Sequence, residues 1–219
     1  IARAQEHESL RSQAARYDAV REVRQALSGS APLVDRLGGL CELIAERLGG
    51  GIATVYLHDP DEGELRLAAT SLQGGGFGGE YRVVLGQGVD GRAAQSRTPA
   101  FLREEDGALA YSALPLIAGE SMVGVLTVRG GGDASRRPGV RLGRALEETL
   151  LEVAAAAADE IAQARREALM SIRATKVSAI NEAGIRLISA RDTNEVASLA
   201  TSSGALILEA DHAILRLQD

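Results

Sequence analysis

The second half of the chain contains one very long stretch of helix-forming sequence. Between Val140 and Ile188 there is no proline and there are only two glycines, Gly143 and Gly184, while alanine, leucine, glutamate and arginine dominate. Because these four residue types have high helix propensities, the sequence predicts one helix over residues 138–188. At 1.5 Å per residue, this helix would be about 70 Å long. Part of it must therefore extend beyond any single small domain.

Apolar and small residues recur along this helix at steps of four, four and three residues. A seam that repeats every eleven residues favours a nearly straight or slightly right-handed coiled coil. An alanine-rich helix also produces regular patterns by chance, so self-association is a firmer prediction than the register. We expect a homodimer through the long helices, and its parallel or antiparallel orientation stays open. The largest predicted seam residues are Leu142, Leu146, Leu150, Val153, Ile161 and Ile172.

Two further helices are predicted before residue 50. Residues 2–27 contain no glycine or proline and place apolar residues at steps of three, four and seven, which is typical of an amphipathic helix. A Ser-Gly-Ser-Ala-Pro segment ends this helix. A second apolar stripe then runs from Leu33 to Leu48 and stops at three consecutive glycines, which favour the end of a helix.

The middle of the chain carries six short apolar or alternating runs that are separated by turn residues. This pattern is typical of an antiparallel sheet. Residues 86–96 predict a short helix between the third and fourth runs. The fold class that follows is α+β: an antiparallel sheet flanked by helices, with long helices on its N-terminal and C-terminal sides. The six predicted strands are residues 52–58, 65–71, 81–85, 100–103, 109–117 and 121–129.

The end of the chain repeats the beginning of the sheet region. Residues 53–59 (Ala-Thr-Val-Tyr-Leu-His-Asp) align with residues 213–219 (Ala-Ile-Leu-Arg-Leu-Gln-Asp), and each run follows a predicted helix. One weak repeat of this kind is what a tandem pair of similar domains would produce. The sequence therefore predicts four segments: an N-terminal helix (1–28), a first domain (29–137), the long connecting helix (138–188) and the truncated start of a second domain (189–219).

Two motifs, in this order, resemble the signatures of the GAF family. Residues 86–94, Gly-Gln-Gly-Val-Asp-Gly-Arg-Ala-Ala, are followed by Thr-Pro-Ala-Phe-Leu at residues 98–102, and together they look like the family's glycine-marked turn and helix. Residues 111–128, with their Pro-Leu, Gly-Glu and Gly-Val-Leu parts, resemble the family's last hairpin. The resemblance covers about residues 25–150, and the segment from about residue 180 looks like the opening of a second such domain.

The resemblance implies a small antiparallel sheet flanked by helices that acts as a sensory or dimerising module. Such modules stand ahead of an output domain, such as a kinase, a cyclase or a transcription activator, which would lie outside this sequence. Two residues of the last hairpin also have a local physical meaning. Pro115 lacks a ladder donor and predicts an edge or a bulge, while Gly124 predicts the close approach of another element to the sheet.

The family's ligand motifs imply no cofactor here, so the ligand is unknown. The cyclic-nucleotide pattern, Asn-Lys then Phe then Asp-Glu, is absent, and the only lysine is Lys176 in the long helix. Bilin-binding members use a pocket cysteine, whereas Cys41 lies in the helix before the first strand, where we expect a small buried side chain. The family's free methionine sulfoxide reductases use several pocket cysteines. The short segment 102–108 leaves little sequence for a lid.

If the sheet holds a small-molecule ligand, its walls are expected among the aromatic and polar residues near the sheet face and its covering loops. The same residues are also good core residues, because the chain has only four tyrosines and two phenylalanines. The candidates are Tyr56, Phe77, Tyr81, Phe101, Tyr111 and Thr127.

Charge and residue spacing argue against several other classes. A formal net charge of −6 does not attract nucleic acid, which is approached by basic surfaces. His7, His58 and His212 are far apart in sequence, so no metal site is predicted. No run approaches the ~20 apolar residues of a membrane span. One cysteine fits a reducing, cytoplasmic location. The carboxylate run at residues 104–106 is typical of a solvated surface, and the sequence offers no convergent catalytic groups.

Two functional hypotheses follow from these observations. The first is a non-enzymatic regulatory or sensory module, excised from a bacterial signal-transduction protein, which couples the GAF-like domain to a neighbouring domain through the long dimerising helix. The second is a purely structural dimerisation domain that binds no ligand, its pocket filled by its own side chains.

Overall fold

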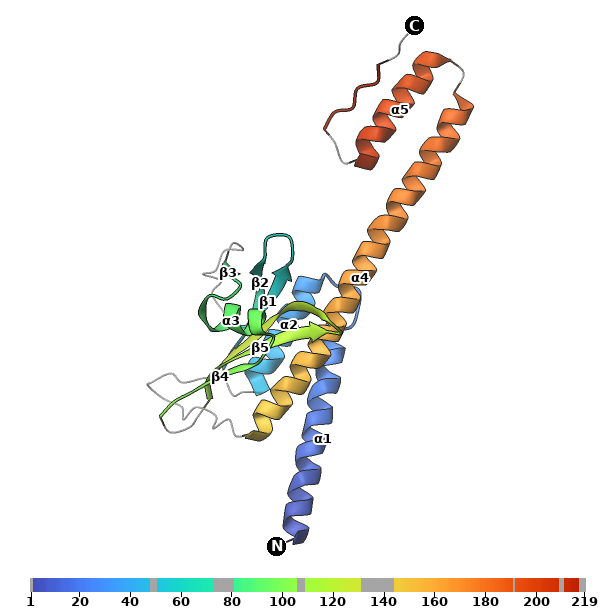
Figure 1. Ribbon diagram of the computed structural model, residues 1–219. Coiled ribbons are helices and arrows are strands. Elements are labelled where there is room, and N and C mark those ends of the chain that lie inside the picture. Colours follow the sequence, from blue (N-terminus) through green and yellow to red (C-terminus); the bar gives the residue numbers. More distant parts are fainter. Residues whose placement is uncertain are drawn as a thin grey trace. The chain divides into compact units, whose positions relative to one another are not determined.

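Two compact units, Ile1–Ala164 and Arg165–Asp219, make up the chain. The computed structural model describes residues 2–47, 51–72, 81–105, 109–130, 144–190, 192–208 and 211–216. The first unit holds a sheet and the helices around it, and the second holds the C-terminal helices (Figure 1).

The first unit is an antiparallel sheet with helices on both faces. All its strand pairs are antiparallel, in the order β3-β2-β1-β6-β5-β4. Each strand begins and ends within one residue of a predicted run, so the predicted α+β class is confirmed. The helices are α1 (Ala2–Leu27), α2 (Leu33–Arg47), α3 (Gly88–Ser96) and the first part of α4 (Arg144–Ser189). The strands are β1 (Ile52–Asp59), β2 (Glu64–Thr70), β3 (Arg82–Val84), β4 (Ala100–Arg103), β5 (Leu109–Ala118) and β6 (Ser121–Arg129).

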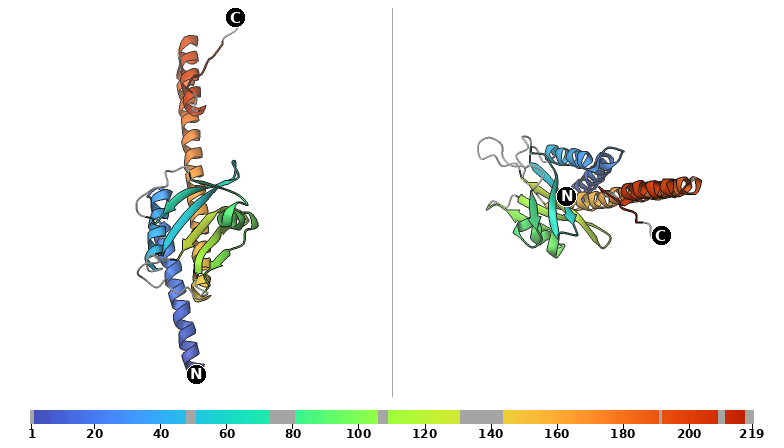
Figure 2. Two further views of the ribbon diagram at one scale, coloured as in Figure 1. Left: turned by 90° about the vertical axis from the view of Figure 1, so that its left-hand side faces the viewer. Right: turned by 90° about the horizontal axis from the view of Figure 1, so that it is seen from above.

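The two faces of the sheet carry different layers. Helices α1, α2 and α4 cover one face, and the short helix α3 lies on the other (Figures 1 and 2). Because successive side chains of a strand point to opposite faces, Val55 of β1 lies in the core below the three helices and Tyr56 lies in the smaller core near α3. The side chains of β6 alternate in the same way, and Leu126 and Val128 point to the face covered by α1, α2 and α4. The core between these three helices and the sheet is called the helix-side core below.

Cys41 is a buried core residue of α2, as its place on an apolar stripe predicts. It lies in the helix-side core with Leu37, Leu40 and Ile44 of the same helix. Burial raises the pKa of its thiol to about 12, so the thiol stays protonated and unreactive at neutral pH. The only cysteine of the chain therefore contributes to packing, on the face of the sheet away from α3.

The first part of α4 packs against the chain's own core, which corrects the predicted dimer seam. Leu150, Val153 and Ile161 are fully buried there, and Leu146 packs half-buried against them. These side chains already contact the sheet side and cannot also form an interface with a second copy. Ion pairs from α4 to α1 and β4 fix the same face: Arg16 binds Glu148 at 2.8 Å, and Arg103 binds Glu147.

The other predicted seam residues have different outcomes. Leu142 lies outside the described residues, as do the other residues of the predicted helix before Arg144. The helix then continues unbroken to Ser189, one residue beyond the predicted end. Ile172 lies on α4 beyond the first unit and is exposed. It is therefore the one described member of the set whose side chain is free to meet a partner.

The sheet register agrees with the prediction for Pro115, and it shows that the close approach at Gly124 comes from within the sheet. A Cβ added at Gly124 would lie 2.1 Å from the carbonyl oxygen of Tyr56, so the element that approaches closely is the neighbouring strand β1. Strand β4 pairs with β5 only as far as Ala113. Pro115 therefore sits where β5 is locally an edge, next to the irregular register after Leu116.

The second unit consists of the last part of α4 and helix α5 (Thr193–Leu208). Asp192 caps α5 by accepting a hydrogen bond from the backbone N–H of Glu195 at 2.8 Å. The two helices meet along a groove that includes Ala179 and Ala183 of α4 and Ile207 of α5. The strand predicted at residues 213–219 is not formed over residues 211–216, where the described part of this unit offers no neighbouring strand to pair with.

Candidate functional site

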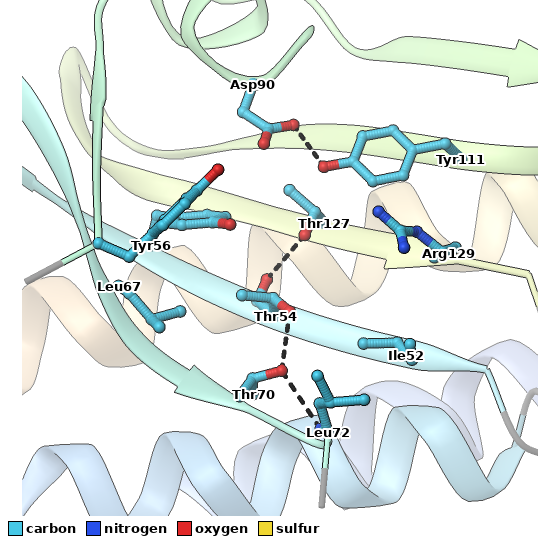
Figure 3. Close-up of a pocket in the computed structure, with 11 residues that line it drawn as sticks. Ile52, Thr54, Tyr56, Leu67, Thr70, Leu72, Asp90, Tyr111, Thr127 and Arg129 are labelled. Carbon is cyan, nitrogen blue, oxygen red and sulfur yellow. Dashed lines mark hydrogen bonds between the residues drawn. The ribbon is translucent and has the colours of Figure 1, made fainter. Parts of the chain in front are cut away.

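A cavity of about 180 Å³ opens on the α3 face of the sheet (Figure 3). Its floor is formed by strands β2, β1, β6 and β5, and α3 contributes one residue from above. The lining residues are Ile52, Thr54, Tyr56, Leu67, Thr70, Leu72, Tyr81, Asp90, Tyr111, Thr127 and Arg129.

The register of the four strands explains why the sheet is hollow at this place. Thr54 pairs with both Thr70 and Thr127, and Thr127 pairs with Ala113, so one row across the sheet holds only small side chains. Large side chains occupy the rows on either side. One row contains Ile52, Arg129 and Tyr111, and the other contains Tyr56 and Leu67. A small row between two large rows leaves a cavity over the middle of the sheet.

The threonines of the central row are tied to one another and to the backbone. The hydroxyls of Thr54 and Thr70 are 3.0 Å apart, and the hydroxyl of Thr127 donates to the carbonyl oxygen of Thr54 at 3.4 Å. The hydroxyl of Thr70 accepts a hydrogen bond from the N–H of Leu72 at 3.3 Å. These bonds hold the cavity floor in one arrangement, as the dashed lines in Figure 3 show.

Asp90 and Tyr111 form the shortest hydrogen bond among the described cavity residues. The hydroxyl of Tyr111 donates to Oδ1 of Asp90 at 2.6 Å. Burial raises the pKa of the Asp90 carboxyl, while the bond from Tyr111 and the charge of Arg129 act in the opposite direction. Burial and the nearby Asp90 also raise the pKa of Tyr111. Asp90 is therefore a partly desolvated carboxylate in a fixed position.

Arg129 provides a positive charge in the same cavity. Its guanidinium carbon lies 5.9 Å from the centre of the Tyr111 ring, which is within the range of a cation–π interaction. Figure 3 shows the side chain extending beside Thr127 and Tyr111. Among the residues that the structure describes, Arg129 forms no ion pair within 4.0 Å, so its donors remain available on this side.

Asp90→Asn is expected to raise the free energy of unfolding at about pH 7. Burial raises the pKa of the Asp90 carboxyl in the folded state above its unfolded value of 3.8. The protonated carboxyl therefore stabilises the fold fully below pH 3.8, and this contribution is lost as the pH rises through the folded-state pKa. Asparagine removes the buried charge and still accepts a bond from Tyr111. Urea denaturation between about pH 7 and pH 3.8 measures the difference in free energy of unfolding between the variant and the natural chain, and this difference should vanish at the acid end. A less stable variant at neutral pH would contradict the prediction.

The structure brings four of the predicted wall residues together at this cavity. Tyr56, Tyr81, Tyr111 and Thr127 line it, and the rings of Tyr56 and Tyr81 are 6.2 Å apart. Phe101 does not line the cavity, because its side chain packs half-buried against the helix-side core. The sixth candidate, Phe77, lies outside the described residues, as does part of the short segment 102–108.

Sequence reasoning missed both charged residues of the cavity. A signal for Arg129 was present, because it follows Thr127 by two residues on a predicted strand and must share its face. Asp90 belongs to the Gly-Gln-Gly-Val-Asp-Gly motif and lies in the first turn of α3, but nothing in the sequence places that helix end above β5 and β6. Only the packing of α3 on the sheet brings the two charges to one space.

Two other kinds of feature are absent from the described ranges. None of the helices there is long and apolar enough to cross a lipid bilayer. The same residues contain no group of three or more His, Cys, Asp and Glu side chains placed to hold a metal ion.

Solved structures with this architecture include GAF domains. The GAF domain of an Acinetobacter phosphoenolpyruvate-protein phosphotransferase is 20% identical, covers 70% of this chain and 96% of its own, and has a TM-score of 0.58. The corresponding domain from Coxiella burnetii is 18% identical with the same coverage and TM-score. Free methionine-R-sulfoxide reductase from Neisseria meningitidis, solved with its substrate, is 18% identical, covers 69% and 91% of the two chains, and has a TM-score of 0.54.

The first unit is therefore a GAF-like domain. Its six-stranded antiparallel sheet and flanking helices match the architecture of these structures. At 18–20% identity the likeness concerns the fold alone. Searches with the sequence find no matching family model and no matching curated protein.

Proposed function

We propose that this chain is a non-enzymatic sensory module of a cytoplasmic bacterial signalling protein. A small molecule binds in the cavity on the α3 face of the GAF-like sheet. Its binding changes the packing of α4 on the opposite face, and α4 carries this change to a neighbouring domain. The module acts as a homodimer that associates through the part of α4 beyond the first unit.

One observation carries this proposal: one face of β6 lines the cavity, and its other face lies in the core to which α4 belongs. Thr127 and Arg129 of β6 line the cavity, whereas Leu126 and Val128 belong to the core that α4 enters with Val153 and Ile161. A shift of β6 on ligand binding is therefore passed to α4 through the core that both elements share. Close-packed cores transmit such shifts because they contain few voids that could absorb them.

The cavity supports binding better than it supports thiol redox chemistry. The GAF-like fold alone does not decide between the two, because the Neisseria protein named above is an enzyme. The only cysteine of this chain lies in the helix-side core with its pKa raised, on the other side of the sheet from the cavity. The cavity itself offers Asp90 bonded to Tyr111, and three threonines bonded to one another and to the backbone.

The dimer is supported by apolar side chains on α4 that stay exposed among the described residues of the second unit. Met170, Val177, Ile180 and Ile188 are all exposed, at steps of seven, three and eight residues. Residues at these steps share one face of a helix, and an exposed apolar face of this kind marks an interaction site. The opposite face, with Ala179 and Ala183, is turned toward α5. The seam that we propose is therefore the Met170 face.

The rival hypothesis, a structural dimerisation domain without a ligand, is favoured by one measurement. The cavity volume of about 180 Å³ is below the roughly 300–1,000 Å³ of common ligand pockets. Native mass spectrometry beside denaturing mass spectrometry separates the two. A dimer that carries extra non-covalent mass supports the sensory module, a dimer without added mass in any extract supports the rival, and a monomer contradicts both.

Val177→Glu combined with Ile180→Glu is expected to convert the dimer to a monomer. Two carboxylates on the apolar face would each have to be desolvated in the interface, and they would also face like charges from the partner. Sedimentation velocity measures the change. Ser178→Glu is the matched control, since Ser178 is exposed on the same turn but off this face. A dimer that survives the double substitution places the interface elsewhere.

A further inference from the structure

We propose that the cavity is built for a small zwitterion: a molecule with an ammonium and a carboxylate group on a short aliphatic body. Its ammonium binds Asp90 and its carboxylate binds Arg129. This inference rests on the proposed function, which requires only that some small molecule enters the cavity.

Two opposite charges enter the cavity from different elements without pairing. Asp90 comes from α3 and Arg129 from β6, and both line the same space (Figure 3). Arg129 is near enough for its charge to lower the pKa of Asp90. Within the described part of the chain, however, no nitrogen of Arg129 comes within 4.0 Å of an Asp90 oxygen. A ligand with both charges fits between them, whereas a direct ion pair would close the gap.

Tyr111 fixes the spacing of the two charges and leaves both with free bonding capacity. Its hydroxyl occupies one oxygen of Asp90, and its ring lies beside the guanidinium of Arg129. A carboxylate has about four acceptor sites, so Asp90 can accept further bonds from an ammonium. A guanidinium has five donors in a planar fork that matches a carboxylate, so Arg129 can bind one with two parallel bonds.

The charges exclude simpler ligands. An anion at Arg129 would be repelled by the Asp90 carboxylate, which is already partly desolvated. A cation at Asp90 would be repelled by Arg129 in the same way. A zwitterion neutralises both groups at once, and the low polarity of the site strengthens each bond.

The remaining walls define the body of the ligand. Three aliphatic residues, Ile52, Leu67 and Leu72, line the cavity from β1 and from β2 and its end. The threonine row already uses its hydroxyls within the floor. A branched aliphatic group fits against the three aliphatic residues. The volume of about 180 Å³ suits a molecule of a few heavy atoms and is too small for a nucleotide.

Isothermal titration calorimetry of the full chain with three matched probes tests the inference. L-leucine carries both charges, 4-methylpentanoate carries the carboxylate only, and 3-methylbutylamine carries the ammonium only, while the aliphatic body is nearly the same. We expect leucine to bind at least about tenfold more tightly than either singly charged probe, since each lost charge-assisted contact contributes about that factor. Equal affinities for the three probes would overturn the inference.

Asp90→Asn and Arg129→Gln separate the two ends of the ligand. In Asp90→Asn, leucine should bind no more tightly than 4-methylpentanoate. In Arg129→Gln, leucine should bind no more tightly than 3-methylbutylamine. Circular dichroism should show that both variants stay folded. Asp61→Asn and Arg82→Gln are the matched controls, because both residues lie outside the cavity, and they should leave the affinity unchanged. Unchanged leucine binding in both cavity variants would also overturn the inference.

Failure of the inference can be told from failure of the proposed function. If a panel of aliphatic amino acids does not bind but native mass spectrometry shows another small molecule lost in Thr127→Leu, the zwitterion is wrong and the sensory module stands. If neither the panel nor any cell extract adds mass to the chain, both are wrong. Thr127→Leu fills the centre of the cavity with an apolar side chain, and Thr201→Leu on α5, outside the cavity, is its control.

Discussion

Ile161→Ala is expected to lower the free energy of unfolding of the GAF-like unit by about 3 kcal/mol. The Ile161 side chain is 0% exposed and lies in the helix-side core with Val55 and Leu126 of the sheet. Truncation removes buried apolar contacts and leaves a cavity between α4 and the sheet, and the two costs add. Urea denaturation followed by circular dichroism measures the change, which should not depend on protein concentration.

Ile172→Ala is the matched control for this prediction. Ile172 lies on the same helix but is 52% exposed, so its truncation should change the free energy of unfolding by less than about 0.5 kcal/mol. The pair distinguishes a core helix from a dimer seam. If Ile161→Ala acted only by weakening a dimer, its effect would grow on dilution, and the packing of α4 on its own sheet would be contradicted.

Gly124→Val is expected to destabilise the same unit by about 3 kcal/mol or to prevent its folding. Gly124 pairs with Leu57, and a Cβ at this position would lie only 2.1 Å from the carbonyl oxygen of Tyr56. The obstructing atom belongs to the backbone of β1, so no side-chain rotation relieves the clash. Strands β1 and β6 would have to separate in the middle of the sheet. Thermal unfolding of the purified variant measures the loss.

Gly39→Ala controls for the loss of a glycine as such. Gly39 lies in the interior of α2 with no atom within 4 Å of an added Cβ. Alanine there should stabilise the unit by about 0.5–1 kcal/mol, because glycine loses more backbone freedom when a helix forms. A Gly124→Val protein as stable as the natural chain would show that the two strands are not packed at this distance.

The strands and helices could be predicted from the sequence because each has a local signal. The alternation of β6, with Leu126 and Val128 on one side and Thr127 on the other, gives both the strand and its two faces. The absence of proline between Val140 and Ile188 gives the long helix. A local signal is not enough for a strand, because its backbone also needs a neighbouring strand to bond to. The strand predicted near the C-terminus has no such neighbour among the described residues.

The candidate site could be predicted only in part. The aromatic residues of the cavity were identified by type, as were the two glycine motifs, but type does not tell a pocket wall from a core residue. Tyr111 and Phe101 illustrate this, since one lines the cavity and the other packs into the opposite core. The difference is the face of the sheet to which each side chain points, and that depends on the strand register.

The sequence by itself determined the positions of the strands and of the helices around them, and the continuity of α4 as far as Ser189, because periodicity and propensity act over a few neighbouring residues. The tertiary structure alone decided what covers their apolar faces. It placed Leu150, Val153 and Ile161 against the chain's own sheet rather than a second copy, and it brought Asp90 and Arg129 to one cavity. The hydrophobic effect is non-directional, so an apolar face in the sequence indicates only that some other surface covers it. Which segment covers it depends on how distant parts of the chain pack together.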